Sequence, residues 1–432
     1  MEQPRAKHRA LVVGVMPEGD DLSEMTELLA TAGVVVVGQV VQHLDRPHPN
    51  TYVGPGKLEE VKEAVARLDA NVVATDDELT PRQERNLEQA LDPVPVVDRT
   101  ATILDIFADH AHTAEGKLQV ELAQLEYNLA RMRGLWTHLE RLGGVSSGGF
   151  ATRGPGESQI ETDRRLARNR IAALKRRLAE VKASRATQRS ERSASHLPQI
   201  AIAGYTNAGK STLLNALTGA ESVGVRDRLF HTLDPTTRVA TMHGRSYLVT
   251  DTVGFIRKLP HQLVDAFGAT LEETRLADLL LHVVDASAPE EDRVAMMRAV
   301  EEVLEEIGAG DRPRLLVFNK ADRLDERAHE DLLLEYSDPA RPAVLVSALT
   351  GEGLEMLGER VEDMFRATLR SVDLLVPYSE GARLAELHEI AGDLERVDTP
   401  EGVRVHARVP AAVAERYARY VANGGRNGGG HA

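Results

Sequence analysis

The sequence predicts a multidomain α/β protein in which a P-loop domain is joined to a doubly wound unit, a long helical hairpin and a small α/β unit. Three observations predict this class. Short apolar runs alternate with helical stretches, one glycine-rich loop joins such a run to a helix, and two long segments space their apolar residues by three and four. We expect an N-terminal doubly wound α/β subdomain over 1–112, a helical hairpin over 113–196, a P-loop domain over 197–369, a small C-terminal α/β domain over 370–423 and a disordered tail over 424–432.

The N-terminal subdomain alternates strand-like and helix-like stretches, which is typical of a parallel sheet with helices on both faces. The expected strands cover 11–15, 34–41, 71–74 and 94–97, and the expected helices lie near 21–32, 57–68, 80–91 and 100–112. No phosphate-binding fingerprint is present, and the glycine-rich stretch 51–56 is more typical of a turn than of a binding site.

The hairpin is predicted by two series of apolar residues with coiled-coil spacing. The series are Leu118, Leu122, Leu125, Leu129, Met132, Trp136 and Leu139, then Ala167, Ile171, Leu174, Leu178 and Val181. This spacing predicts two long helices, most simply an antiparallel pair. Between them the glycine-rich residues 143–156 are expected to form a mobile tip. Its Phe150 and Arg153 suit contact with RNA, although a plain hairpin loop explains the same composition.

The phosphate loop is residues 204–211. The apolar run 198–203 predicts a strand entering the loop, and the leucine spacing of 211–217 predicts a helix leaving it. Gly204 and Gly209 let the backbone aim N–H groups at phosphates, to which the helix N-terminus adds positive charge. We expect Lys210 to bridge the β- and γ-phosphates and the Ser211 hydroxyl to hold Mg²⁺.

A second motif, Asp251–Gly254, follows the strand-like residues 246–250. A carboxylate at this strand end can hold a Mg²⁺-bound water, and the Gly254 N–H can reach the γ-phosphate. The motif is weak alone, and its place after the phosphate loop gives it weight.

Two further motifs select the base. Asn319–Asp322 follows the apolar run 315–318, and Ser347 and Ala348 follow the apolar run 343–346. The Asp322 carboxylate accepts two hydrogen bonds from guanine N1–H and the exocyclic amine. Adenine offers no such pair, so discrimination on the order of 10⁴ is expected, and GTP rather than ATP is the expected substrate. The Ala348 N–H is expected to contact the guanine carbonyl.

These motifs define the expected nucleotide contacts. They are Gly204, Tyr205, Thr206, Asn207, Ala208, Gly209, Lys210, Ser211, Thr212, Asp251, Thr252, Val253, Gly254, Asn319, Lys320, Asp322, Ser347 and Ala348.

Two positions refine the chemistry. Phe255 stands where many GTPases of this fold place the glutamine that orients the attacking water, so we expect slow intrinsic hydrolysis. Packing of the ring in the core is compatible with this. Asn207 matches the position of an asparagine that coordinates K⁺ in one group of cation-activated GTPases, or it caps the loop.

Composition excludes several classes. The chain has no cysteine, so it has neither disulfides nor a thiolate metal site. Its formal charge of −15 argues against a uniformly basic nucleic-acid binder, but residues 164–192 hold eleven Lys or Arg against two acids. That stretch is either a footprint for an anionic partner or a solvated helix face. Apolar runs are too short for a membrane span and the polar start is unlike a signal peptide, so we expect a cytoplasmic protein. We also expect the free protein to be monomeric.

Motifs along nearly the whole chain resemble the HflX family of GTPases. The segments that carry the resemblance are 51–60, 77–86, 98–107, 115–125, 153–157, 163–165, 204–211 and 229–238. The resemblance implies a GTPase that associates with ribosomes. It would bind the large ribosomal subunit and its RNA and split stalled ribosomes under stress. Of the two explanations for the basic stretch 164–192, this implication favours a contact with RNA over a solvated helix face.

The family pattern also places the first switch. It implies that the Mg²⁺-binding threonine is Thr232, and spacing alone could not choose among Thr232, Thr236 and Thr237. It also implies that Phe230 and Asp234 lie beside the nucleotide. The expected catalytic residues are then Lys210, Thr232 and Gly254, and the expected metal ligands are Ser211, Thr232 and, through water, Asp251. This sequence departs from the family at His231 and in its longer loop 146–152.

Two other functions fit parts of the sequence. One is a GTPase of ribosome assembly or RNA modification, distinguished by the subunit and state that it binds. The other is an ATP-using RNA-remodelling module, which nucleotide binding by residues 1–190 alone would favour.

Overall fold

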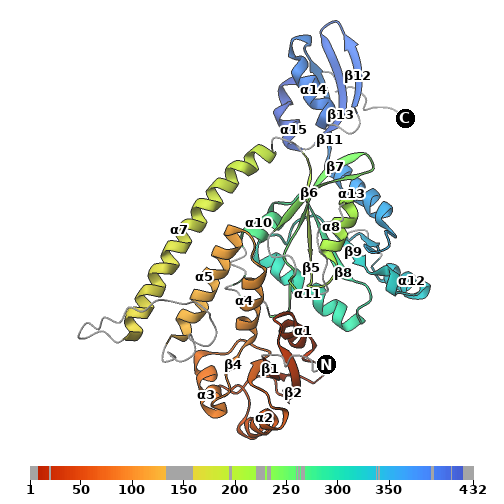
Figure 1. The fold of residues 1–432 in the computed structure, drawn as a ribbon. Coiled ribbons are helices and arrows are strands. Elements are labelled where there is room, and N and C mark those ends of the chain that lie inside the picture. The colour runs from red at the N-terminus through yellow and green to blue at the C-terminus, as the bar shows by residue number, and fades with distance from the viewer. Residues whose placement is uncertain are drawn as a thin grey trace, which may run out of the picture.

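The computed structural model describes residues 8–18, 21–132, 159–193, 197–219, 229–230, 235–258, 260, 263, 268–336, 338, 341–390, 394–409 and 411–421. Its strands form three sheets, each with helices against it, and two long helices lie beside the first sheet's helices (Figure 1). This architecture confirms the predicted multidomain α/β class. Predictions for Thr232, Asp234, the tip 143–156 and the tail 424–432 fall outside the described residues.

The N-terminal sheet has four parallel strands in the order β2-β1-β3-β4. The strands are β1 (Arg9–Met16), β2 (Val35–His43), β3 (Val72–Thr75) and β4 (Val96–Val97). The helices are α1 (Ser23–Thr31), α2 (Pro55–Leu68), α3 (Pro81–Leu91) and α4 (Arg99–His110). The apolar run of β1 is buried between the two helical layers, as expected for a central parallel strand. The carboxyl ends of β1, β3 and β4 therefore meet at one edge of the sheet.

Side-chain caps fix where the helices of this sheet begin. Thr80 and Gln83 form a capping box around Pro81, and Asp98 accepts a hydrogen bond from the Ala101 N–H at 2.8 Å. Such caps supply partners for the free N–H groups of a first turn, so α3 and α4 start at defined residues.

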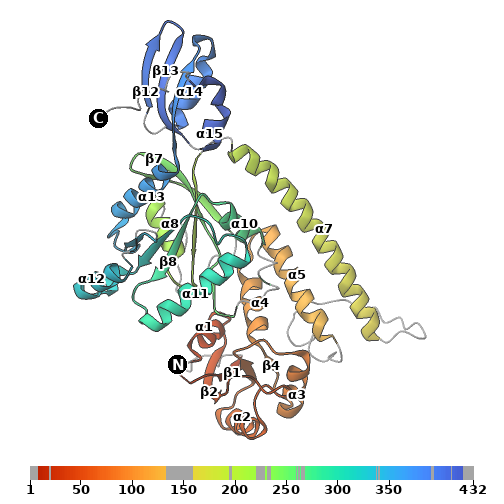
Figure 2. The same cartoon turned by 180° about the vertical axis from the view of Figure 1, so that it is seen from behind.

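Helices α5 (Ala114–Arg131) and α7 (Gln159–Ser193) lie side by side and run in opposite directions (Figures 1 and 2). Leu122 of α5 packs with Leu174 and Leu178 of α7. The last residue of α5, Arg131, is buried and donates to the Leu79 carbonyl at 2.7 Å and to Asp98 at 3.0 Å. These contacts fix α5 to the carboxyl edge of the N-terminal sheet.

The central sheet has six strands in the order β10-β9-β8-β5-β7-β6. They are β5 (Gln199–Gly204), β6 (Thr236–Met242), β7 (Arg245–Asp251), β8 (Leu279–Asp285), β9 (Arg314–Asn319) and β10 (Ala343–Leu345). Only β6 is antiparallel to its neighbour. The parallel strands bring the carboxyl ends of β5, β7 and β9 together, and each of these ends carries one of the predicted motifs.

Helices cover both faces of this sheet, which explains why β5 and β8 read as continuous apolar runs. The helices are α8 (Lys210–Thr218), α10 (Gly268–Leu276), α11 (Glu290–Glu306), α12 (Glu326–Glu335) and α13 (Leu354–Thr368). Alternate residues of β5 face the α8 and α13 side and the α10 and α11 side.

The C-terminal sheet is antiparallel, in the order β11-β13-β12. It consists of β11 (Arg370–Val376), β12 (Leu394–Thr399) and β13 (Gly402–Val409), with α14 (Gly381–Ile390) and α15 (Ala411–Arg416) against it. In sequence, residues 372–423 show only two strand-like stretches, so the third strand corrects that prediction. The edge strand β12 is polar and mostly exposed, so it lacks the apolar alternation that marks a strand in sequence.

No helix among the described residues is both long and apolar enough to cross a membrane.

Candidate functional site

The phosphate loop connects β5 to α8 at the carboxyl edge of the central sheet. Gly209 has a φ of +90°, and a Cβ built on it would lie 2.2 Å from Asn319 Nδ2. A glycine is needed here because a side chain would be strained and would displace a residue of the base motif. Asn207 is exposed on the loop with a φ of +60°.

Lys210 is buried inside this loop. Its Nζ donates to the Tyr205 carbonyl at 2.7 Å. Burial lowers the pKa of Lys210 to about 8, an effect that the charge of Asp251 partly opposes. A buried ammonium that is bonded to a carbonyl has unused capacity for an anion, so the residue fits the phosphates of a nucleotide.

Ser211 and Asp251 meet beside the loop, since the Ser211 Oγ donates to Asp251 Oδ2 at 2.6 Å. Asp251 is 1% exposed. A hydroxyl and a carboxylate are hard oxygen donors of the kind that Mg²⁺ prefers, so these two side chains fit the predicted metal site. The third predicted ligand, Thr232, lies outside the described residues.

The segment after Asp251 lies directly on the phosphate loop. Thr252 is buried and its Oγ1 donates to the Ile202 carbonyl at 2.7 Å. A Cβ built on Gly254 would come within 2.8 Å of Thr206 Cγ2 and 3.0 Å of Lys210 Nζ. Gly254 is thus placed next to the lysine that is predicted to hold the γ-phosphate.

Phe255 joins this segment to the loop through its backbone. Its N–H donates to the Gly204 carbonyl at 3.1 Å, and its carbonyl accepts from the Thr206 N–H at 2.7 Å. The phenyl ring is 0% exposed and packs in the core. The ring therefore offers no polar group to an attacking water.

The base motif is tied to the phosphate loop by Asn319. Its Nδ2 donates to the Ala208 carbonyl at 2.9 Å, and its Oδ1 accepts from the Ala348 N–H at 2.9 Å. The Ala348 N–H, the predicted donor to guanine, is thus directed at Asn319. The Ser347 Oγ donates to Asp322 Oδ1 at 2.5 Å, which orients the carboxylate that is predicted to read the base.

Two acidic residues that contact these motifs were not predicted from the sequence. Asp285 ends β8 and pairs with Lys320 at 2.6 Å, which holds the lysine of the base motif. Its position at a strand end, like that of Asp251, was the available signal. Glu24 of α1 accepts a hydrogen bond from the Tyr205 hydroxyl of the phosphate loop. Nothing in the local sequence distinguishes Glu24 from other helix-surface acids.

One predicted contact lies elsewhere. The side chain of Phe230 is buried and meets the Phe107 ring of α4 edge-on, with 4.6 Å between the ring centroids. The neighbouring Leu229 N–H donates to Thr31 Oγ1 at 3.3 Å. The described part of the predicted first switch, Leu229 and Phe230, therefore packs on the N-terminal subdomain. Thr232 and Asp234 lie outside the described residues. The other predicted site residues between Gly204 and Ala348 gather at the carboxyl edge of the central sheet.

Three family models match the chain in succession. The one described as "GTP-binding GTPase N-terminal" matches residues 19–108, "GTP-binding GTPase Middle Region" matches 110–192, and "50S ribosome-binding GTPase" matches 199–320.

Curated relatives match over almost the full length. GTPase HflX of Lacrimispora saccharolytica is 45% identical over 95% of this chain and 96% of its own. GTPase HflX of Caldanaerobacter subterraneus subsp. tengcongensis is 45% identical over 97% of this chain and 95% of its own. Among solved structures, a GTP-binding protein from Sulfolobus solfataricus in complex with GDP is 26% identical over 82% of this chain and 98% of that chain, with a TM-score of 0.43.

Proposed function

From the premise that the chain belongs to the HflX family of GTPases and hydrolyses GTP, we propose that it binds the large ribosomal subunit. We propose further that its GTP-bound state splits stalled ribosomes under stress in the cytoplasm. The match of residues 199–320 to a model described as a 50S ribosome-binding GTPase carries this proposal.

The exposed basic face of α7 supports an RNA partner. Leu174 and Leu178 bury one side of the helix against α5, while Arg168 and Arg176 are exposed on it. Clustered arginines on a helix bind phosphate groups and release counterions from RNA. Two other cations of α7 pair within the protein, Arg170 with Glu121 at 2.7 Å and Lys175 with Glu126 at 2.8 Å.

The chemistry at the sheet edge follows from the buried cation and the backbone donors. In the proposed mechanism Lys210 and the loop N–H groups hold the phosphates, and the Gly254 N–H stabilises charge that develops on the γ-phosphoryl group. Ser211, Asp251 and Thr232 would hold Mg²⁺, which neutralises phosphate charge when bound. Asp322, held by Ser347, would read the guanine.

Slow intrinsic turnover is part of the proposal. The buried hydrocarbon ring of Phe255 cannot orient a water molecule, so the ribosome would provide or stabilise that geometry. An external activator of this kind raises hydrolysis by about 10³–10⁵-fold.

The test is GTP turnover in potassium buffer with no addition, with purified large subunits and with small subunits. We expect large subunits to stimulate turnover and small subunits to leave it unchanged. A turnover rate that large subunits do not change would refute activation by the ribosome. The Arg168→Glu, Arg176→Glu variant should lose stimulation. The matched control Arg327→Glu, Arg341→Glu reverses two well-exposed arginines of the central domain and should retain it.

Two further measurements separate the finer points. Dissociation of whole ribosomes by the protein with a non-hydrolysable GTP analogue would support splitting, whereas binding only to immature large subunits would favour an assembly role. The potassium role of Asn207 stays a prediction, and replacing K⁺ by Na⁺ in the same turnover assay tests it.

A further inference from the structure

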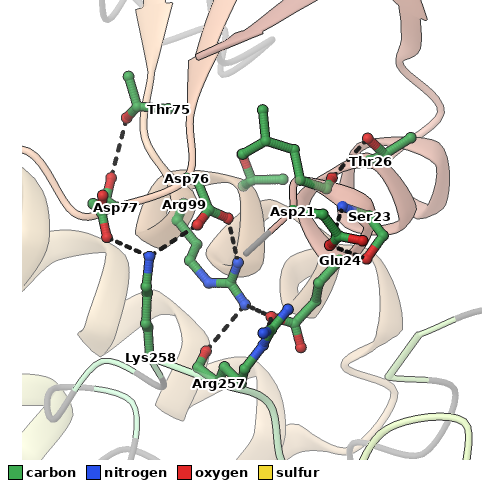
Figure 3. Close-up of polar contacts among 12 residues, drawn as sticks. Asp21, Ser23, Glu24, Thr26, Thr75, Asp76, Asp77, Arg99, Arg257 and Lys258 are labelled. Atoms are coloured by element: carbon green, nitrogen blue, oxygen red, sulfur yellow. Dashed lines mark hydrogen bonds and ion pairs between the residues drawn. The ribbon is translucent and has the colours of Figure 1, made fainter. Parts of the chain in front are cut away.

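The carboxyl edge of the N-terminal sheet is filled by side chains from the central domain. In a doubly wound sheet this edge, where the strand order reverses, is the usual place for a ligand. Here Asp76 and Asp77 follow β3, Glu24 lies on α1 and Arg99 begins α4. Figure 3 shows Arg257 and Lys258, from the segment after Gly254, reaching toward these residues.

The contact is an ion-pair network with the buried Arg99 at its centre and the half-exposed Lys258 at its margin. Arg99 is 2% exposed; it pairs with Asp76 at 2.8 Å and with Glu24, and donates to the Arg257 carbonyl at 3.0 Å. Lys258 Nζ pairs with Asp76 at 2.9 Å and with Asp77 at 2.6 Å. The Arg257 guanidinium lies 3.6 Å from Glu24, so three cations balance three carboxylates. A nucleotide phosphate at this edge would be repelled by these carboxylates. The network therefore argues against a second nucleotide site here.

Lys258 adopts an unusual backbone conformation in this contact, with a φ of +54°. The left-handed region costs an ordinary L-residue roughly 1–2 kcal/mol. Burial alone would lower the pKa of Lys258, but Asp76 and Asp77 raise it, so the side chain stays charged. The ion pairs therefore hold the segment in a geometry that it would not adopt by itself.

The same network extends to the phosphate loop through Tyr205. The Tyr205 hydroxyl donates to Glu24 and accepts from the Arg257 N–H at 2.7 Å. Burial and the charge of Glu24 raise the pKa of Tyr205, so its proton is retained. The Tyr205 carbonyl in turn accepts from Lys210. A carboxylate of the N-terminal subdomain thus orients a hydroxyl that touches both the loop and the segment carrying Gly254.

We propose that Glu24 is a positioning residue for GTP hydrolysis, acting through Tyr205 and Arg257 to fix Gly254 against the phosphate loop. The N-terminal subdomain, docked by Lys258 on Asp76 and Asp77, would then set the turnover rate rather than serve only as a tether. Loss of positioning lowers kcat, because a small displacement of a group needed in the transition state slows the reaction strongly. Nucleotide affinity changes little, because the other contacts of the loop still hold the nucleotide.

The test compares Glu24→Gln and Lys258→Met with the wild-type full chain in steady-state GTP hydrolysis and GDP binding. We expect kcat to fall about tenfold or more in both variants, with KM and GDP affinity changed less than about threefold. Lys258 is half-exposed, so its variant keeps the proposal testable if Glu24→Gln does not fold. The control Glu84→Gln disturbs the pairing of Glu84 with Arg131 at 2.9 Å in the same subdomain, away from the central domain. It should keep the wild-type kcat.

A double-mutant cycle tests the route through Tyr205. If Glu24 acts through the hydroxyl, Tyr205→Phe and Glu24→Gln lower kcat by similar factors and the double variant falls little further. Effects that multiply would overturn the proposal. So would an unchanged kcat in Glu24→Gln and Lys258→Met, or a Glu84→Gln variant that is equally slow.

Discussion

Replacing Gly209 by alanine should break the link between the phosphate loop and the base motif. The new Cβ would lie 2.2 Å from Asn319 Nδ2, so this buried side chain must retreat by about 1 Å to reach ordinary contact. Its hydrogen bonds to the Ala208 carbonyl and from the Ala348 N–H, both 2.9 Å, would then be lost. Each buried polar group left without its partner costs about 1–3 kcal/mol. GDP would span the loop and the base motif, so its binding must restore this geometry. A cost of at least about 2 kcal/mol then corresponds to a roughly 30-fold loss of GDP affinity.

Gly219, at the other end of α8, provides the matched control. Its φ is +63°, but a Cβ there would meet nothing within 4 Å. Gly219→Ala should therefore lower the free energy of unfolding by about 1 kcal/mol and leave GDP affinity unchanged. Competition titration with a fluorescent GDP analogue and thermal unfolding measure the two effects. A Gly209→Ala protein that binds GDP within threefold of the wild type would refute the reasoning.

Three other predictions concern pH and base choice. Burial lowers the pKa of Lys210 to about 8, and bound phosphates would favour its charged form, so GDP affinity should fall with rising pH above about 8; a Lys210→Met variant that keeps the same slope would contradict this. Burial, with the charges of Arg314 and Lys210 nearby, lowers the pKa of His282 from 6.5 to about 3. The contribution of neutral His282 to the free energy of unfolding is therefore complete above pH 6.5 and is lost as the pH falls toward 3. Urea unfolding of His282→Leu should therefore show about 2 kcal/mol less loss of stability between pH 6.5 and pH 5, and an unchanged loss would argue against it. Asp322→Asn should weaken guanine nucleotides about 10³-fold in equilibrium binding and favour xanthine nucleotides, since an amide cannot accept both guanine donors; retained preference for guanine would exclude the assigned role.

The elements that carry the site were predictable because their signals are local. The apolar runs ending at Gly204, Asp251 and Asn319 give strands β5, β7 and β9, and parallel order then brings their ends together. The capping residues Thr80 and Asp98, which the structure shows at the starts of α3 and α4, are local signals of the same kind. Such signals lie within a few residues of the feature that they predict.

The contacts between distant segments were not predictable in this way. Tyr205 and Glu24 are 181 residues apart in sequence, and Asn319 and Ala208 are 111 apart. A partly buried acid that fixes a phosphate-loop hydroxyl has the same sequence pattern as an exposed acid on an amphipathic helix. The packing of Phe230 on Phe107 also depends on how two domains meet, which no local pattern contains.

The N-terminal subdomain is joined to the central domain at two widely separated places. One is covalent, where the chain passes from α7 to β5, and the other is a docked surface where Lys258 pairs with Asp76 and Asp77, Tyr205 bonds to Glu24 and Phe230 packs on Phe107. Helix α7 has 35 residues, so it is a strut about 50 Å long. A body fixed at two points has one axis of rotation, and releasing all the contacts of the docked surface would leave a single pivot at the end of that strut. A turn of only about 5° about this pivot would sweep the far end through about 4 Å, enough to separate every hydrogen bond of the docked segment at once.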